Sequence, residues 1–233
     1  MRIRWLGHSC FFITSGRGIK ILIDPYGKNL EYTLPKVSPD IVLLSHHHFD
    51  HNAHWRAEGK PRVVKRTSDF QEEHEVNIKG ETIKFKGIPT YHDTSLGKKK
   101  GPNTIFVWPL DDINFCYLGD LGHPLSEKEF ENIDKVNVLF VPVGGLTTID
   151  GKGAADIVDR LSPGLVFPMH FKTEYSGEVL KNILSDDASV FLARMKDVRT
   201  LDTDTFNFNP SDIKEAYTEG TRVYSLKYIP SEE

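Results

Sequence analysis

The chain has 233 residues, of which 39% are hydrophobic and 27% charged, and its formal net charge is −4. This composition is ordinary for a globular protein with a sizeable core, and its mild acidity disfavours bulk binding to nucleic acid or to a membrane surface. The sequence lacks a run of 18 apolar residues and an apolar leader, which predicts a cytoplasmic protein without transmembrane helices. The two cysteines, Cys10 and Cys116, lie in apolar runs and are expected to be buried, reduced thiols.

Extended segments are predicted for the first half of the chain, because its apolar residues come in short runs rich in Val, Ile and Phe. Turn signals separate these runs at residues 15–18, 79–81 and 111–112, and the last two indicate hairpins. The run at 41–45 is continuously apolar, which favours a strand buried on both faces. The expected strands are 2–13, 18–24, 41–45, 62–67, 77–91, 103–110 and 113–118.

Helices and strands alternate in the second half. Ser126 and Glu129 have the spacing of a capping box at the start of a helix. The expected helices are 126–136, 153–161 and 176–184, and the expected strands are 136–143, 165–169, 188–193 and 222–229. Early strands followed by β and α in alternation predict stacked sheets covered by helices. We expect one domain, 1–233, with a core to about residue 195 and a C-terminal extension from about 196.

The segment SHHHFDH at residues 45–51 directly follows the predicted strand 41–45. Residues at i and i+2 of an extended segment point the same way, so His46 and His48 can reach one metal ion together. Asp50 and His51 come one step later, where the chain turns, and point towards a second nearby position. Imidazole nitrogen and carboxylate oxygen are ligands that zinc takes. The intervening histidine alternates away from its neighbours and is expected to be a bystander.

Three further residues of metal-binding type end apolar, strand-like runs: His92, Asp120 and His170. Each alone would more often be an ordinary polar residue at a strand end. Loops that follow strand ends are nevertheless where sites are commonly assembled on a rigid scaffold. Together with the histidine cluster, these residues predict a centre that holds two metal ions.

The motif His46-x-His48-x-Asp50-His51 resembles the signature of the metallo-β-lactamase superfamily. The later phrases GPNTIF, YLGDLGH, VPVGGLTTID and FPMHFK are similar to a branch of stand-alone metal-dependent hydrolases that includes ascorbate-6-phosphate lactonase-like enzymes. The resemblance extends from Gly7-His8-Ser9 to about residue 193. It implies an α/β fold of the αββα type, in which two mostly antiparallel or mixed sheets form a sandwich with helices outside.

The resemblance also implies a binuclear metal centre. The matching positions are His46, His48 and His92 for the first ion, Asp50, His51 and His170 for the second, and Asp120 as a bridge between them. Ser45 stands where the superfamily often has Thr, and Asn52 where Gly is frequent, but no ligand is lost. Zinc is the expected metal, with manganese or iron as alternatives. Asp24 is implied to hydrogen-bond residues 45–51, the histidine loop, although a turn-forming aspartate before a proline fits equally well.

The implied activity is hydrolysis by a hydroxide that bridges the two ions, with Asp50 and Asp120 as catalytic residues. A small ester, lactone or phosphoester is the expected substrate, and the oligomeric state stays open. A nucleic-acid phosphodiesterase is the main alternative, but such relatives usually carry an added arm and a basic surface. A diiron oxidoreductase and a non-catalytic scaffold are weaker alternatives, because the ligand set is complete and no flavin domain is seen.

Several other residues are candidates for contact with the ligands or the substrate. His8 and His123 are the first two. Lys98, Lys99 and Lys100 lie between two glycines shortly after His92. This segment is either a lid over the site with a cationic tip or a solvated hairpin tip. If it is a lid, the substrate carries a negative group such as phosphate or carboxylate.

Overall fold

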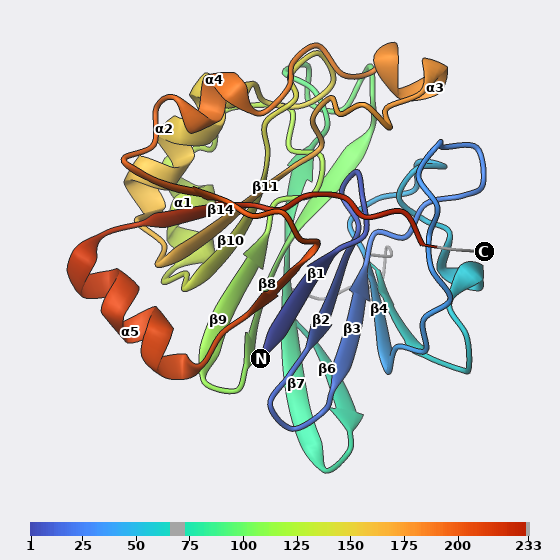
Figure 1. Ribbon diagram of the computed structural model, residues 1–233, viewed down its shortest axis with the longest axis vertical. Coiled ribbons are helices and arrows are strands. Elements are labelled where there is room, and N and C mark those ends of the chain that lie inside the picture. Colours follow the sequence, from blue (N-terminus) through green and yellow to red (C-terminus); the bar gives the residue numbers. More distant parts are fainter. Residues whose placement is uncertain (66–72, 232–233) are drawn as a thin grey trace.

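The computed structural model describes residues 1–65 and 73–231. Two mixed β-sheets face each other in it (Figure 1). The six-stranded sheet has the order β13 (Thr205–Asn207), β1 (Arg2–Trp5), β2 (Phe11–Thr14), β3 (Lys20–Ile23), β4 (Ile41–Leu44) and β5 (Arg62–Lys65). The eight-stranded sheet has the order β12 (Asp197–Thr200), β14 (Arg222–Ser225), β11 (Leu165–Met169), β10 (Val138–Pro142), β9 (Ile113–Tyr117), β8 (Pro102–Leu110), β7 (Glu81–Tyr91) and β6 (Glu73–Ile78).

The helices lie outside the two sheets (Figure 1). They are η1 (His54–Arg56), α1 (Glu127–Ile133), α2 (Gly151–Leu161), α3 (Glu178–Lys181), α4 (Ser189–Leu192) and α5 (Pro210–Glu219). Helix α2 packs on β10, and α4 packs on α2. The main core fills the space between the sheets, where the rings of Phe11 and Phe140 lie 4.5 Å apart. The expected two-sheet sandwich with outer helices is therefore confirmed.

The strand directions bring the predicted site residues to one edge of the sandwich. In the first sheet β1 and β3 run the same way, because each is antiparallel to β2, and β4 is parallel to β3. In the second sheet β7 runs with β9, since both are antiparallel to β8, and β9, β10 and β11 are parallel. The residues that follow these strand ends are His8, Asp24, His46, His92, Asp120 and His170.

The predicted strand 2–13 is wrong in one respect, because a tight turn divides it into β1 and β2. The amide of Leu6 donates to the carbonyl of Cys10, and the amide of Cys10 donates to that of Gly7. Gly7 has a φ of +96°, and a Cβ there would collide with the ring of Tyr32. The apolar composition hid this turn, which places the next residue, His8, inside the molecule.

The predicted strand 188–193 is also wrong. Residues Ser189–Leu192 form the short helix α4, whose Phe191 is buried. The predicted helix 176–184 shrinks to α3, Glu178–Lys181. In the predicted segment 62–67, residues 62–65 form β5 and the last two lie outside the described residues. The capping box at the start of α1 is confirmed, because the Ser126 hydroxyl accepts from Glu129 and the Glu129 carboxylate accepts in return.

The C-terminal segment is built into both sheets. Strand β13 pairs with β1 in the first sheet, and β12 and β14 extend the second sheet beside β11. Of these elements, the sequence predicted only the strand that begins at Arg222. Both cysteines are buried and unpaired, as expected. Within the described ranges, no helix has the length and apolar character needed to cross a membrane.

Candidate metal centre

All seven residues predicted as metal ligands lie together at the edge where the strands end, and they come from both sheets. Their side chains are buried except that of His48, which is half-buried. Potential ligand atoms of His46, His48 and His92 lie within 4.8 Å of one another. Nε2 of His46 is 3.1 Å from Nδ1 of His48, so these two nitrogens face the same point. This geometry matches the first predicted ion site.

A second cluster of potential ligands is more completely buried than the first. Potential ligand atoms of Asp50, His51 and His170 lie within 4.8 Å of one another, and those of His8 lie within the same distance. The His8 and His170 rings are 4.5 Å apart. The sequence ranked His8 only as a contact candidate, but the turn between β1 and β2 makes it part of this cluster.

Asp120 lies between the two clusters. Its Oδ2 atom is 3.0 Å from Nε2 of His92 and 3.0 Å from Nε2 of His170. The same oxygen is 3.2 Å from Nε2 of His51. Because His92 belongs to the first cluster and His170 to the second, one carboxylate is placed to serve both.

Three of the ligand histidine rings are oriented by a contact to the nitrogen that faces away from the centre. Nδ1 of His51 is 3.1 Å from Oδ2 of Asp24, and Nδ1 of His92 is 2.7 Å from the carbonyl of Thr147. Nδ1 of His46 is 2.9 Å from the Ser45 hydroxyl. Such contacts fix the tautomer and leave Nε2 free to bind metal.

Asp24 is the centre of a buried hydrogen-bond network. Its Oδ1 accepts from the amide of Ser45 at 2.8 Å, and its Oδ2 accepts from the hydroxyls of Ser45 and Tyr117, the latter at 2.9 Å. These contacts, with the one to His51, join β3, β4 and β9. Of the two readings of Asp24, the structure therefore supports contact with the histidine loop.

Asn103 is a buried residue whose role the sequence did not reveal. Its side-chain nitrogen donates to Thr90 and to the carbonyl of Leu118, both at 2.9 Å, and its oxygen accepts from the amide of Asp120 at 3.0 Å. Asn103 thus holds the turn that carries Asp120. A polar residue inside the apolar strand β8 was the signal available in the sequence.

The backbone is strained at three buried positions of the centre. His8, Asp24 and His170 have φ values of 51°, 43° and 53° although none is a glycine. Such conformations cost about 1–3 kcal/mol each and persist where the surrounding structure over-determines them. Gly144 packs so closely on the carbonyl of His170 that a Cβ would not fit. The fold therefore stabilises one geometry here at the expense of local strain.

The histidines of the centre fall into two groups according to whether their pKa values are lowered or raised. Burial, with the nearby His170, lowers the pKa of His8 to about 4. Burial also lowers the pKa of His46 well below its usual value. Burial opposes the charged form of His51 too, but the carboxylates of Asp120 and Asp50 outweigh it and raise the His51 pKa. Although burial acts against it, the surrounding histidines hold the pKa of Asp120 well below its ordinary range.

The donor set fits divalent metal ions. Within the described residues, Nδ1 of His170 and Oδ1 of Asp120 are buried without a hydrogen-bond partner. Nε2 of His51 and Nε2 of His170 lie 3.2 and 3.0 Å from Oδ2 of Asp120, but in orientations that form no hydrogen bond. Buried polar groups are normally paired, and an orphaned set is explained by an ion at that position. The atoms are imidazole nitrogens and carboxylate oxygens, which suit zinc, iron and manganese.

The remaining candidates occupy different places. Nε2 of His123 accepts from the amide of Tyr91 at 3.2 Å, so this ring supports the end of β7 and lies apart from the metal clusters. Lys99 and Lys100 line a hollow with Asp50 and Asp120, which we call the metal hollow. Lys98 is not among the described residues that line the metal hollow.

The lysine-bearing loop is closed by one carboxylate. Oδ1 of Asp93 accepts from the amides of Ser95 and Gly97, at 2.7 and 3.0 Å. Its Oδ2 accepts from the amides of Lys99 and Lys100, at 3.0 and 2.7 Å. These bonds give the loop a defined shape, so the two lysines are held at the mouth of the metal hollow.

Two facing mixed sheets with a buried His/Asp cluster at their shared edge define a metal-dependent hydrolase of the metallo-β-lactamase fold. The chain belongs to the β-lactamase superfamily, because the family model of the β-lactamase superfamily domain matches residues 2–170. It groups there with the stand-alone UPF0173 metal-dependent hydrolases.

Individual relatives agree with this assignment. The chain is 32% identical over 190 residues to a UPF0173 protein of Pyrococcus abyssi, covering 76% of this chain and 86% of that one. A UPF0173 metal-dependent hydrolase of Thermoplasma volcanium is 27% identical over 191 residues, covering 74% and 84%. A crystal structure from Thermotoga maritima, described as a Zn-dependent hydrolase of the metallo-β-lactamase superfamily, superposes with a TM-score of 0.74 at 30% identity, covering 97% and 98%.

Proposed function

We propose that this protein binds two divalent ions, preferably zinc, and hydrolyses a small, anionic ester, lactone or phosphoester. The observation that carries the proposal is the position of Asp120 Oδ2, 3.0 Å from both His92 Nε2 and His170 Nε2. One carboxylate shared by two histidine clusters is the arrangement that a bridged pair of ions requires. When bound, the ions would supply an activated water at neutral pH and positive charge for the oxygen under attack.

The residues of the site have two kinds of role in this proposal, metal binding and orientation of the ligand rings. His46, His48 and His92 would hold the first ion, while His51, His170 and Asp50 would hold the second. Asp120 would offer its carboxylate to both ions. Asp24, Ser45 and Thr147 bind the outward nitrogens of the ligand rings and thereby keep the inward nitrogens aimed at the centre.

His8 acts as a positioning residue in this proposal. Its Nε2 is 3.2 Å from Oδ2 of Asp50, which suits an N–H donor that fixes one carboxylate oxygen. The pKa of His8, lowered to about 4 by burial and by His170, keeps the ring neutral, so it carries one proton to donate. His8 would then determine which oxygen Asp50 presents to the second ion.

The negative charge of the substrate is inferred from Lys99 and Lys100. Both are exposed, both line the metal hollow, and Asp93 holds their loop in place. Lysine meets an anion as a flexible point charge. A carboxylate or phosphate a few bonds from the scissile bond would therefore lie under this loop.

The test is a substrate panel on zinc-loaded and manganese-loaded protein purified without a histidine tag. The panel contains a lactone, a carboxylic ester, a phosphodiester and a single-stranded RNA, each with and without a remote carboxylate or phosphate where possible. We expect about two metal equivalents per chain and turnover of a small anionic member. The Asp120→Asn variant controls for contaminants and should be inactive. A chain that takes up no metal overturns the proposal, and turnover of RNA alone replaces it with a nuclease.

A further inference from the structure

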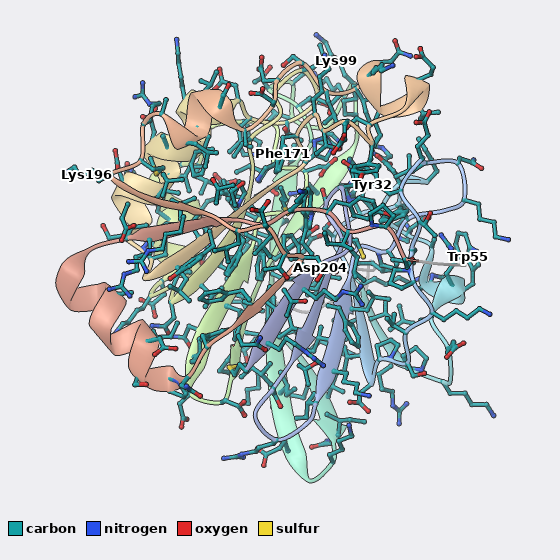
Figure 2. All side chains as sticks on the ribbon, in the orientation of Figure 1. Tyr32, Trp55, Lys99, Phe171, Lys196 and Asp204 are labelled. Atoms are coloured by element: carbon teal, nitrogen blue, oxygen red, sulfur yellow. The ribbon has the colours of Figure 1, made fainter. Side chains whose placement is uncertain are left out.

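Trp55 is the exposed tryptophan of the chain. Its side chain is 66% accessible, whereas Trp5 and Trp108 are 3% and 0% accessible. It projects from the periphery of the molecule (Figure 2). Exposure leaves a large apolar surface in water, and grouped apolar surface of this kind commonly marks a binding site.

The backbone that carries Trp55 is firmly held. The amide of Ala53 donates to the carbonyl of Pro25 at 2.7 Å, and the amide of Arg56 donates to the carbonyl of Ala53 at 3.0 Å. The guanidinium of Arg56 donates to the carbonyls of Tyr26 and Leu34, both at 3.3 Å. These hydrogen bonds anchor the backbone around Trp55, which lies four residues after His51. The exposed indole is therefore carried by an ordered segment.

Trp55 is one wall of a hollow of about 490 Å³, which we call the Trp55 hollow. Phe49, which is 48% accessible, lines it as well, together with His47 and Lys28. This volume falls within the usual range for small-molecule sites, about 300–1,000 Å³. His47, which the sequence indicated to be a bystander, thus lines this hollow.

The Trp55 hollow adjoins the metal hollow. Phe49 lines both of them, next to Asp50 on the metal side. A molecule that reacts in the metal hollow can therefore reach the Trp55 hollow by passing over one side chain. This continuity argues for one occupant of both hollows, namely the remote part of the substrate.

We propose that the Trp55 hollow binds a flat apolar group, in the class of a single aromatic ring, that belongs to the substrate whose scissile bond lies in the metal hollow. The proposal rests on the proposed hydrolase function. Two exposed aromatic side chains on one hollow suit stacking with a ring, which needs no hydrogen-bond pattern. Trp55 and Phe49 are then residues that determine substrate specificity.

The first experiment measures binding without turnover. Acrylamide quenching of tryptophan fluorescence reports mainly on Trp55 in the metal-loaded protein, since the other two indoles are buried. Phenylacetate should protect the quenchable fraction, and acetate, which shares the carboxylate but lacks the ring, should not. The Trp55→Phe variant removes the reporter and should abolish the quenchable signal. Equal effects of phenylacetate and acetate overturn the subsite.

The second experiment compares methyl phenylacetate with methyl acetate, which share the reacting ester. The wild-type ratio of kcat/KM should favour the aromatic ester by about tenfold, within the range that stacking of one ring supplies. Trp55→Ala should lower that ratio towards that of the uncatalysed esters, and Trp55→Phe should restore most of it. Val190→Ala, an exposed apolar position on α4, is the matched control. A ratio that Trp55→Ala leaves unchanged overturns the subsite.

The outcomes separate this inference from the proposed function. Hydrolysis of both esters without ring preference and without protection of Trp55 removes the subsite and leaves the hydrolase. Protection of Trp55 by phenylacetate in a protein that hydrolyses no member of the panel keeps the hollow as an aromatic site and removes the hydrolase. A thermal melt of each variant confirms that the fold is retained.

Discussion

Nε2 of His8 lies 3.2 Å from Oδ2 of Asp50, although the two residues are 42 positions apart in the chain. His8 follows the first strand of one sheet, and Asp50 belongs to the histidine loop that follows β4 of the same sheet. Both side chains are buried, and Nδ1 of His8 has no hydrogen-bond partner among the described residues. The contact therefore connects the second cluster of potential ligands to the turn between β1 and β2.

Replacing His8 by Phe should weaken the second ion selectively. The ring volume is kept while the contact to Asp50 is lost, and loss of such an outer contact typically costs about 10–100-fold in metal affinity. Elemental analysis after mild chelation should then give about one equivalent per chain, against about two for the wild type. His74→Phe, at an exposed position of β6, is the control for loss of a histidine. Two ions retained with unchanged affinity would contradict the positioning role.

Replacing Asp24 by Asn should destabilise the protein as well as the site. One side-chain oxygen becomes an NH₂ group, so a buried acceptor of the network with Ser45, Tyr117 and His51 is lost. An unsatisfied buried group costs about 1–3 kcal/mol, which corresponds to a decrease in Tm of roughly 2–12 °C for a chain of this size. Calorimetry of the metal-free protein measures it. Asp202→Asn, an exposed carboxylate, is the control and should shift Tm by less than about 1 °C.

Zinc binding at pH 7 should release protons. The carboxylates of Asp120 and Asp50 raise the pKa of His51 against the effect of burial, so its ring holds a proton in the metal-free protein that an ion must displace. Calorimetric titration in buffers of different ionisation enthalpy counts these protons. Lowering the pH should weaken binding further and lower activity, because protons compete with the ion for His51 and His92, whose pKa values the carboxylate of Asp120 raises against the effect of burial. No proton release, together with constant affinity from pH 5 to 8, would refute this account.

The metal-free protein should lose stability on mild acidification because of His8 and His46. Their pKa values are lowered by burial, that of His8 to about 4, so the folded state keeps the rings neutral while the unfolded state binds protons below about pH 6.5. Their contribution is complete above pH 6.5 and decreases as the pH falls towards 4. His51, with a raised pKa, contributes in the opposite sense and loses its contribution as the pH rises. His8→Phe should flatten the acid side of a Tm-against-pH curve; an unchanged slope would argue against this assignment.

The lysines of the loop should differ in their effect. Lys99→Ser with Lys100→Ser should reduce kcat/KM about three- to tenfold on an anionic substrate, and less on a neutral one of the same bond type. Added salt should diminish the difference, because both ammonium groups are exposed. Lys98→Ser provides the matched control from the same loop, since Lys99 and Lys100 line the metal hollow and Lys98 does not. No loss from the Lys99 and Lys100 substitutions, or a loss that is equal on the anionic and the neutral substrate, would favour a solvated tip without a role in binding.

The metal ligands could be predicted from the sequence, because each follows a recognisable apolar strand. His46, His48, Asp50 and His51 are contiguous, so local geometry alone places them together. His92, Asp120 and His170 needed only the rule that strand-end loops gather at one edge, and parallel strands make that rule reliable. Their roles as ligands stay predictions until metal is measured.

Only the tertiary structure decided the surroundings of these ligands. The turn at His8 was hidden inside an apolar run, and Asn103 looked like one polar residue in a strand. Both act on partners far along the chain, Asp50 and Asp120, and no local pattern encodes such a contact. The exposure of Trp55 could not be predicted from the sequence either, because it depends on which other segments pack nearby. Short-range periodicity and spacing thus determined the strands and the ligand types, whereas the order in which the strands lie within each sheet decided which remote side chains support them.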